Sequence, residues 1–220
     1  MSSFVLYNYF RSSTSFRARV ALNIKGIEFD YKAINLLKDE QHSEEYQKLN
    51  PMQGIPTLVH DGKVIPDSAA ILWYLEDIRP EPPLQPKDAY LKARMRQICE
   101  IVNSSMHPYG NLKITKALTK DYGFSEEQKN EWFHRWIGQG LTALEKVLPE
   151  IAGTYCVGDQ VTMADIFLYP QIITCQRFKV DLTPYPTIMK IFANCDKNPH
   201  FKKAHFSRQI DTPEELRAKD

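Results

Sequence analysis

Apolar and polar positions follow two different periods over roughly the first 78 residues. Phe16, Val20 and Ile24 recur one helical turn apart, and Gly26 follows where such a helix would end. Other stretches alternate residue by residue, as strands do. The pattern predicts a strand at 4–7, a helix at about 13–25, a strand at 29–34, a loop with a short helix at 38–49, a hairpin at 57–65 with an Asp-Gly turn, and a helix at about 67–78. This order indicates a small α/β sheet domain.

Prolines interrupt the pattern after the last of these helices. Four prolines stand within seven residues, at positions 80, 82, 83 and 86, and prolines at this density stop helices and stiffen a connection. From about residue 88 the apolar positions keep a helical spacing. We therefore predict an α/β domain at residues 1–79, a proline-rich linker at 80–87 and an all-helical domain at 88–220.

The helical half carries two further signals. Trp132 and Trp136 lie four residues apart on an apolar stripe, so we predict that both pack in the core. Val161–Ile166 is a compact helix start, in which Thr162 and Asp165 can form a capping box. The helix that follows is apolar on nearly all sides and should be central to its domain. Asp165 is therefore interpreted as a buried structural acid and not as a catalytic one.

Composition and charge exclude several classes of protein. The chain has 220 residues, of which 43% are hydrophobic and 25% charged, as is typical of a soluble globular protein, and its net charge is +1. Such a balance favours neither nucleic acid nor an anionic membrane as a partner. The sequence has no apolar run long enough to span a bilayer and no secretory pattern at its start. We expect a cytoplasmic protein.

The cysteines predict neither a metal site nor a redox dithiol. Cys99, Cys156, Cys175 and Cys195 lie far apart and form no Cys-x-x-Cys pair. They are interpreted as reduced thiols, in keeping with the cytosol.

Four hydroxyl residues stand where the first strand gives way to the first helix, namely Ser12, Ser13, Thr14 and Ser15. A helix N-terminus has unpaired backbone N–H groups and a partial positive charge. One hydroxyl is enough to cap such an end. A larger cluster also suits a bound anion, such as a phosphate, a carboxylate or a thiolate. Both interpretations stay open on these residues alone.

Two further stretches could bind the backbone of a ligand. In Asn50–Leu58, a cis Pro56 would make a tight turn and leave the N–H and C=O of Ile55 facing outward to pair with a peptide-like ligand. Asp67 and Ser68 open the next helix. They could cap that helix, or hold the carboxylate and amine of an amino-acid end, and both roles can hold together.

These motifs together resemble a known family. The chain is similar to the cytosolic glutathione transferases, and most of all to their zeta class, at Tyr9–Arg17, Asn50–Leu58, Asp67–Ser68, Val157–Asp165, Gln176–Pro186 and Asp211–Arg217. The resemblance covers essentially the whole chain. It implies a thioredoxin-like α/β N-terminal domain, an all-α C-terminal domain, a homodimer, and glutathione as a cofactor bound to the first domain.

The resemblance also implies roles for individual residues. Ser12 or Ser13 would donate to the glutathione sulfur, with Thr14 beside them in the catalytic motif. Arg177 would meet a carboxylate of a diacid substrate, although its alternative role is a surface or interdomain salt bridge. The implied glutathione-binding residues are Gln41, Ile55, Pro56, Asp67, Ser68, His107 and Asn111, and no metal is implied.

The implied chemistry depends on a thiolate. A free thiol has a pKa of about 8.5, and a decrease of about two corresponds to roughly 2.7 kcal/mol, which two hydrogen bonds and a helix end can supply. The thiolate would add to the cis double bond of maleylacetoacetate, and rotation and release would give fumarylacetoacetate, a step of tyrosine and phenylalanine catabolism. The alternatives are a general glutathione transferase acting on halogenated acids or other electrophiles, and a non-enzymatic binding protein on the same fold.

The sequence departs from the class pattern at several places. Relatives usually have Cys where Thr14 stands, so chemistry that needs this second thiol is not implied here. Gly54 replaces a usual polar residue, and Asp67 and His107 stand where Gln is common. The hydroxyl donors are retained, whereas the changes at Gly54 and His107 bear on glutathione binding and on substrate choice.

Overall fold

The computed structural model describes residues 3–219, and its contacts divide the described chain into two compact units. One contains the residues up to Pro83 together with those from Asp196 onward, and the other is Leu84–Cys195. The final segment, which we call the tail (residues 196–219), thus groups with the first unit, whereas the sequence led us to place it in a domain at 88–220. The domain ranges drawn from the sequence stay a prediction.

The first unit is built on a mixed sheet. Within residues 3–219 four strands form one sheet in the order β2-β1-β3-β4, with β1 at Phe4–Asn8, β2 at Asp30–Ala33, β3 at Thr57–His60 and β4 at Lys63–Pro66. β1 pairs parallel with β2 and antiparallel with β3. The helices of this unit are α1 (Ser13–Ile24), α2 (Glu44–Leu49), α3 (Ser68–Ile78) and α9 (Pro199–Ala204), with short 3-10 segments η1 (Glu40–His42), η4 (Phe206–Arg208) and η5 (Glu214–Leu216).

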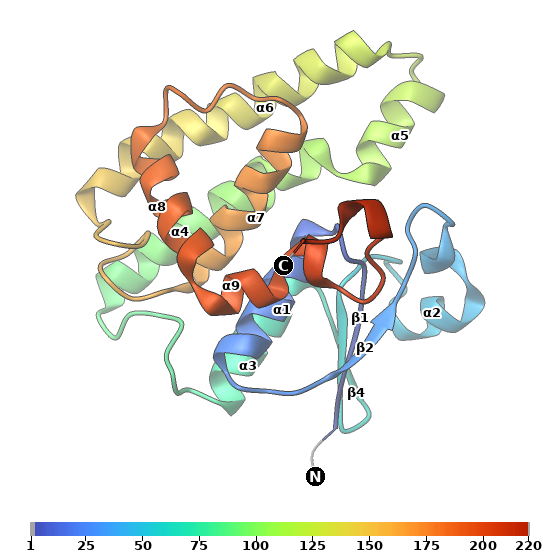
Figure 1. Ribbon diagram of the computed structural model, residues 1–220, viewed down its shortest axis with the longest axis horizontal. Coiled ribbons are helices and arrows are strands. Elements are labelled where there is room, and N and C mark those ends of the chain that lie inside the picture. The colour runs from blue at the N-terminus through green and yellow to red at the C-terminus, as the bar shows by residue number, and fades with distance from the viewer. Residues whose placement is uncertain (1–2, 220) are drawn as a thin grey trace. The chain divides into compact units, whose positions relative to one another are not determined.

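The predicted elements of this unit are confirmed within a residue or two, because local pattern specifies them. Leu6 and Leu58 face each other across β1 and β3, and both are fully buried. The β3–β4 hairpin turns at Asp61 and Gly62, whose φ values of +47° and +78° suit an Asp-Gly turn. In Figure 1, α1 lies alongside α9, and the two helices are in contact. The α9 helix of the tail therefore supports α1.

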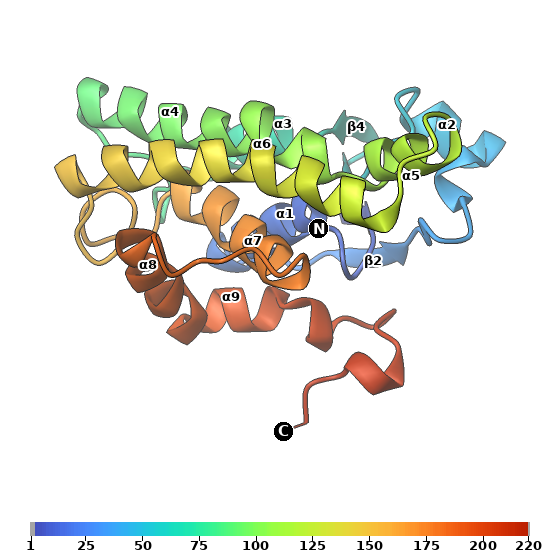
Figure 2. The same ribbon diagram turned by 90° about the horizontal axis from the view of Figure 1, so that it is seen from above.

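The second unit is helical. Its elements are α4 (Ala89–Ser105), η2 (His107–Gly110), α5 (Leu112–Lys120), α6 (Glu126–Val147), η3 (Leu148–Glu150), α7 (Met163–Arg177) and the start of α8 (Pro186–Lys197). Figure 2 shows α4 and α6 running side by side with α7 next to them, and α4 packs against both. Most of α7 is buried. The prediction that α7 is central to its unit is confirmed.

Asp165 is held as a structural acid, as the sequence indicated. Its carboxylate is fully buried and accepts hydrogen bonds from the backbone N–H groups of Cys156, at 2.7 Å, and Thr162, at 2.8 Å. The Thr162 hydroxyl donates to the same carboxylate at 3.0 Å. Burial raises the pKa of the Asp165 carboxyl, while these hydrogen bonds lower it. The acid fixes the start of α7 to the preceding loop.

The prediction for the two tryptophans of α6 is off by one position. Trp132 and Trp136 are half-buried, and the fully enclosed residues are their neighbours Phe133 and Ile137. The two indoles hold η2 instead. The Trp132 Nε1–H donates to the Tyr109 carbonyl at 3.2 Å, and the Trp136 ring stacks on the Tyr109 ring at a centroid distance of 4.8 Å.

Three further observations bound the chemistry of the described chain. No helix in residues 3–219 is both long and apolar enough to cross a membrane. The same residues contain no group of three or more His, Cys, Asp or Glu side chains that could hold a metal ion. All four cysteines carry free, buried thiols.

Candidate functional site

The hydroxyl residues at the start of α1 differ in their structural roles. Ser12 is the N-cap, and its Oγ accepts a hydrogen bond from the Ser15 N–H at 3.1 Å. Ser13 and Thr14 are the first two residues of the helix, and all three hydroxyls of Ser12, Ser13 and Thr14 are half-buried. The capping interpretation therefore applies to Ser12. The cap does not involve the hydroxyls of Ser13 and Thr14, so the anion interpretation stays open beside it.

A hydrogen-bond chain joins this helix start to the loop before β3. The Thr14 hydroxyl donates to the Ile55 carbonyl at 3.0 Å, and the Ser12 and Thr14 hydroxyl oxygens lie 2.9 Å apart. A hydroxyl has one proton, so with the Thr14 proton on Ile55 the Ser12 proton points to Thr14. The chain thus runs from Ser12 through Thr14 to Ile55, and it joins two stretches that the sequence predicted separately.

This chain corrects part of the prediction for Ile55. The Ile55–Pro56 peptide is cis, as predicted. The Ile55 carbonyl is not free, however, because Thr14 already occupies one of its two lone pairs. Within the described residues, the Ile55 N–H has no hydrogen-bond partner. The site can therefore offer a peptide-like ligand one donor and one remaining acceptor at Ile55.

Two buried side chains that the sequence reasoning missed hold this loop. The Tyr46 hydroxyl and the Asn50 amide both donate to the Gly54 carbonyl, at 2.6 and 2.9 Å. The Tyr46 hydroxyl also lies 2.9 Å from the Thr57 hydroxyl, and burial raises the pKa of Tyr46. Tyr46 is an aromatic residue in an otherwise polar segment, and that contrast was the signal available in the sequence.

Asp67 and Ser68 stand at the start of α3, but Asp67 does not cap it. The Asp67 carboxylate is exposed and makes no capping hydrogen bond, so that part of the prediction is wrong. Its backbone has a φ of +68°, which residues other than glycine rarely adopt, and its N–H donates to the Pro56 carbonyl at 3.2 Å. Residues in such strained conformations cluster at functional sites, and the Asp67 carboxylate is left exposed.

Ser68 is anchored by an arginine that the sequence reasoning did not single out. The Arg17 guanidinium is fully buried and donates to the Ser68 hydroxyl at 3.2 Å. Arg17 is part of α1, so α1 and α3 are joined where both helices carry predicted site residues. A buried arginine within an apolar helix face is a sequence signal that could have pointed to this contact.

Gln41 has an unsatisfied acceptor. It lies in η1 and is 8% exposed, and its Nε2 donates to Asp39 at 3.3 Å. Its Oε1 is buried and has no hydrogen-bond partner within the described residues. A buried acceptor without a donor costs roughly 1–3 kcal/mol, so an N–H from a ligand would stabilise this residue.

The remaining predicted residues belong to the second unit. His107 is the first residue of η2 and Asn111 follows its last residue. The Asn111 side chain caps α5 by accepting the Lys113 N–H at 2.8 Å. Arg177 is exposed at the end of α7, and its guanidinium carbon lies 5.0 Å from the centre of the Phe178 ring. Eight of the predicted residues thus lie in the first unit and three in the second.

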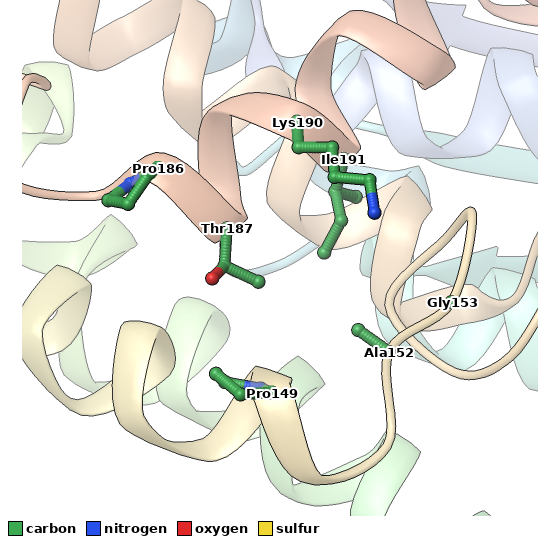
Figure 3. A pocket seen from close by; sticks show the side chains of 7 residues that line it. All are labelled: Pro149, Ala152, Gly153, Pro186, Thr187, Lys190 and Ile191. Atoms are coloured by element: carbon green, nitrogen blue, oxygen red, sulfur yellow. The ribbon is translucent and has the colours of Figure 1, made fainter.

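The second unit also has a shallow hollow of about 330 Å³. Figure 3 shows the seven residues that line it: Pro149, Ala152, Gly153, Pro186, Thr187, Lys190 and Ile191. None of the residues predicted for the site is among them. The N-terminus of α8 beside it is already occupied, because the Glu145 carboxylate accepts the N–H groups of Thr187, at 2.8 Å, and Ile188, at 3.1 Å. We assign it no role in the chemistry.

Comparison with known proteins identifies the family. The models for the N-terminal and C-terminal domains of glutathione S-transferase match residues 11–78 and 111–206. A solved structure of a maleyl pyruvate isomerase, described as a bacterial glutathione S-transferase in the zeta class, superposes with a TM-score of 0.93. The sequences are 39% identical, and the match covers 95% of this chain and 100% of that one. The chain belongs to the zeta class of the glutathione S-transferases.

This zeta-class glutathione S-transferase has further relatives with the same kind of name. It is 47% identical over 215 residues to the maleylacetoacetate isomerase of Rattus norvegicus, and the match covers 97% of each chain. A maleylacetoacetate isomerase from Anaeromyxobacter dehalogenans was solved with glutathione in its active site, at a TM-score of 0.87 and 38% identity, over 96% of this chain and 99% of that one. The resemblance and the fold class inferred from the sequence are confirmed.

The groups found in the first unit of this transferase fit glutathione chemically. The N-terminus of α1 suits a thiolate, since its partial positive charge and hydroxyls favour an anion. The orphan Oε1 of Gln41 suits an amide N–H, and the exposed Asp67 carboxylate suits an ammonium group. The free N–H of Ile55 suits a peptide carbonyl. A γ-glutamyl tripeptide thiol contains all four matching groups, namely a thiol, an amide N–H, an ammonium group and a peptide carbonyl.

Proposed function

We propose that this chain is a glutathione-dependent isomerase that converts maleylacetoacetate to fumarylacetoacetate. The observation that carries the proposal is the Ser12–Thr14–Ile55 hydrogen-bond chain at the start of α1, in a protein so similar to named maleylacetoacetate isomerases. Glutathione, when bound, supplies a thiolate that adds reversibly to the electron-poor double bond and so permits rotation about it.

The hydroxyls at the start of α1 would bind and orient the sulfur. Ser12 can turn its proton from Thr14 to the sulfur while its lone pair still accepts the Ser15 N–H, so capping and sulfur binding are compatible. Ser13 offers a second hydroxyl from the first turn. Donors of this kind, next to a positive helix end, lower the pKa of a thiol from about 8.5 and raise its thiolate fraction near neutral pH.

The other predicted residues would bind and orient the two reactants. Ile55, beside cis Pro56, would pair with the cysteinyl backbone of glutathione, and Arg177 would hold a carboxylate of the diacid substrate. The residues assigned to the rest of glutathione are Gln41, Asp67, Ser68, His107 and Asn111.

We also infer the setting of the enzyme from its class. The proposal includes a cytoplasmic homodimer that acts in tyrosine and phenylalanine catabolism, with a glutathione-binding domain at 1–79, a linker at 80–87 and a domain at 88–220 that contributes the substrate site. Light scattering coupled to size exclusion tests the dimer directly: a mass near 25.5 kDa, that of one chain, would contradict it.

The decisive experiment measures maleylacetoacetate isomerisation with and without glutathione for the wild type, Ser12→Ala and Ser13→Ala. Loss of the hydroxyl that donates to sulfur is expected to lower kcat about 100-fold, as removal of one donor to a developing anion does elsewhere. Loss of the other hydroxyl should lower kcat far less. Ser12→Ala should in addition cost about 1 kcal/mol of stability through the lost cap, whereas Ser13→Ala should not.

Binding and turnover together separate this proposal from its alternatives. Folded wild type that binds glutathione calorimetrically and turns over halogenated acids or aryl halides, but not maleylacetoacetate, would identify a general glutathione transferase. Protein that binds glutathione and turns over none of these would leave a binding role on the same fold.

A further inference from the structure

The tail carries a motif that the proposed function does not use. Asp211–Arg217 was singled out in the sequence, and it lies in the segment that groups with the first unit. The tail is folded on itself: the Thr212 hydroxyl donates to the Phe206 carbonyl, the Arg217 Nε to the Thr212 carbonyl at 3.1 Å, and the Ala218 N–H to the Ser207 carbonyl at 3.1 Å. These bonds present Asp211 as a fixed group.

Each oxygen of the half-buried Asp211 carboxylate accepts one hydrogen bond from a different part of the unit. Oδ2 accepts the backbone N–H of Phe10 at 3.0 Å. Oδ1 accepts the Tyr31 hydroxyl on β2 at 2.5 Å. Hydrogen bonds to an ionised acceptor are about twice as strong as neutral ones. The tail therefore holds the loop between β1 and α1 from 201 residues away in the sequence.

Phe10 belongs to the turn that leads directly into Ser12. The Ser12 N–H donates to the Tyr9 carbonyl at 3.1 Å, which closes a turn with Phe10 at its second position. The N–H at that position is not used by the turn itself, so Asp211 satisfies a group that would otherwise need a partner. The hydrogen bond is thus made two residues before the first catalytic hydroxyl.

A buried arginine holds the same turn by its carbonyls. The Arg19 guanidinium is 1% exposed and donates to the carbonyls of Tyr9, at 3.3 Å, and Phe10, at 3.0 Å. Its Nε donates to the carbonyl of Ala204, at the end of α9. Burial lowers the pKa of Arg19 to about 10, and Tyr31 and Asp211 partly offset that effect. A cation therefore holds the carbonyls of the turn and an anion holds its Phe10 N–H. Both groups also connect the turn to the tail.

We propose that Asp211 is a positioning residue for the catalytic hydroxyls, acting through the Phe10 N–H. The inference rests on the proposed function, because it assigns Asp211 to the placement of Ser12 and Ser13 toward the glutathione sulfur. Displacement of a catalytic group by about 1 Å can cost up to 100-fold in rate, so a carboxylate that fixes the turn before these hydroxyls affects the chemistry without touching it.

The test compares three variants that differ in which bond they lose. Asp211→Ala removes both acceptors. Asp211→Asn keeps one oxygen for the Phe10 N–H, and its amide can donate to the Tyr31 oxygen, so it should rescue the turn. Tyr31→Phe removes only the Tyr31 bond and leaves Phe10 held, which makes it the matched control for loss of tail contacts in general.

Three readouts apply to these variants: kcat and KM, the pKa of the bound glutathione thiol from thiolate absorbance, and amide exchange of residues 10–15. Asp211→Ala should lower kcat about tenfold with little change in the KM for substrate, and raise the pKa of the bound thiol by about one. Asp211→Asn and Tyr31→Phe should stay within about twofold of the wild type in kcat. Equal losses in Asp211→Ala and Tyr31→Phe, or an unchanged thiol pKa in folded Asp211→Ala, would overturn the proposal.

One measurement, amide exchange of Phe10, needs neither a variant nor glutathione. In the wild type the Phe10 amide should exchange at least 100-fold more slowly than an unprotected amide, since its acceptor belongs to a docked tail. Free exchange of that amide would overturn the inference even if Asp211→Ala fails to fold. Failure of the proposed function would look different, because the wild type would then not convert maleylacetoacetate, while its Phe10 amide stayed protected.

Discussion

Thr14 shows how a single hydroxyl can join two parts of a site. Its hydroxyl donates to the Ile55 carbonyl while pairing with Ser12. A cysteine thiol would be a weaker donor than this hydroxyl, so the threonine gives a firmer link between α1 and the loop before β3 than a cysteine would. The threonine therefore contributes to holding the glutathione-binding backbone as well as standing in the catalytic motif.

We predict that Thr14→Val destabilises the protein by about 1–2 kcal/mol, because about 1 kcal/mol is lost for each of two hydrogen bonds while the side-chain shape is kept. Glutathione should bind more weakly, since Ile55 is no longer held. Urea unfolding and calorimetric titration measure the two effects. Thr14→Ser, which keeps the hydroxyl, is the control and should behave like the wild type. Equal stability of the Val and Ser variants would refute the role given to the hydroxyl.

At this scale the sequence predicts contacts that are local. Ser12 as a cap joins residues three apart, and a hydroxyl before an apolar helix predicts it directly. The Thr14–Ile55 bond spans 41 positions, and no spacing rule relates two such residues. For the same reason the anchoring of Ser68 by Arg17, 51 positions apart, was not predicted.

Among the elements, η4 of the tail has a built-in sensitivity to acid. The His205 Nδ1 lies 2.7 Å from the Ser207 hydroxyl and accepts the Ser207 N–H, which requires a neutral ring. Burial lowers the pKa of His205, Arg19 and Arg208 lower it further, and Asp196 raises it. Protonation would remove the acceptor and add a charge beside two arginines.

We predict that stability falls as the pH drops below about 6.5, and that His205 contributes to the fall. A histidine whose pKa is lower in the folded state binds its proton more readily in the unfolded state, so acid favours unfolding over the interval from its ordinary pKa down to the lower folded value. Urea midpoints at pH 7.5 and pH 5.5 measure the effect. His205→Asn, which can accept the Ser207 N–H without titrating there, should show a smaller difference between the two pH values. The same pH dependence in both proteins would contradict the assignment.

Most helices and strands could be predicted because their patterns are confined to one segment. α7 is the clearest case, since its capping box and its apolar residues on all sides fall within about fifteen positions. The two tryptophans of α6 were misplaced because they outweigh their smaller neighbours in any hydrophobic pattern. The structure instead uses their rings to hold Tyr109, with Phe133 and Ile137 facing the core.

For the whole molecule, the part that sequence could not supply is the place of the tail. The prolines at 80–86 predicted a boundary after the first domain, and the first unit contains the chain up to Pro83 together with the tail. Nothing in the helical spacing of the last residues distinguishes them from the helices before, yet they group with the first unit. The contacts responsible, such as Phe10 with Asp211, join chain ends and have no local signature.

A buried ion pair holds the proline segment that follows α3. The Lys25 ammonium, at the end of α1, lies 2.6 Å from the Glu76 carboxylate of α3, and both residues are at most 5% exposed. The same ammonium donates to the carbonyls of Pro80, at 3.3 Å, and Pro82, at 2.7 Å. One cation therefore fixes the two helices and the proline segment together.

We predict that Lys25→Met destabilises the protein by about 3–5 kcal/mol, because it leaves the Glu76 carboxylate buried without its partner. Adding Glu76→Leu should recover only part of this loss. The double variant removes the uncompensated charge, but the Pro80 and Pro82 carbonyls still lack the donor that holds them. Denaturant unfolding of the two single variants and the double variant gives the coupling energy. A double variant as stable as the wild type would mean that the ammonium contributes nothing to holding the proline segment, and that the pair serves only the packing of α1 on α3.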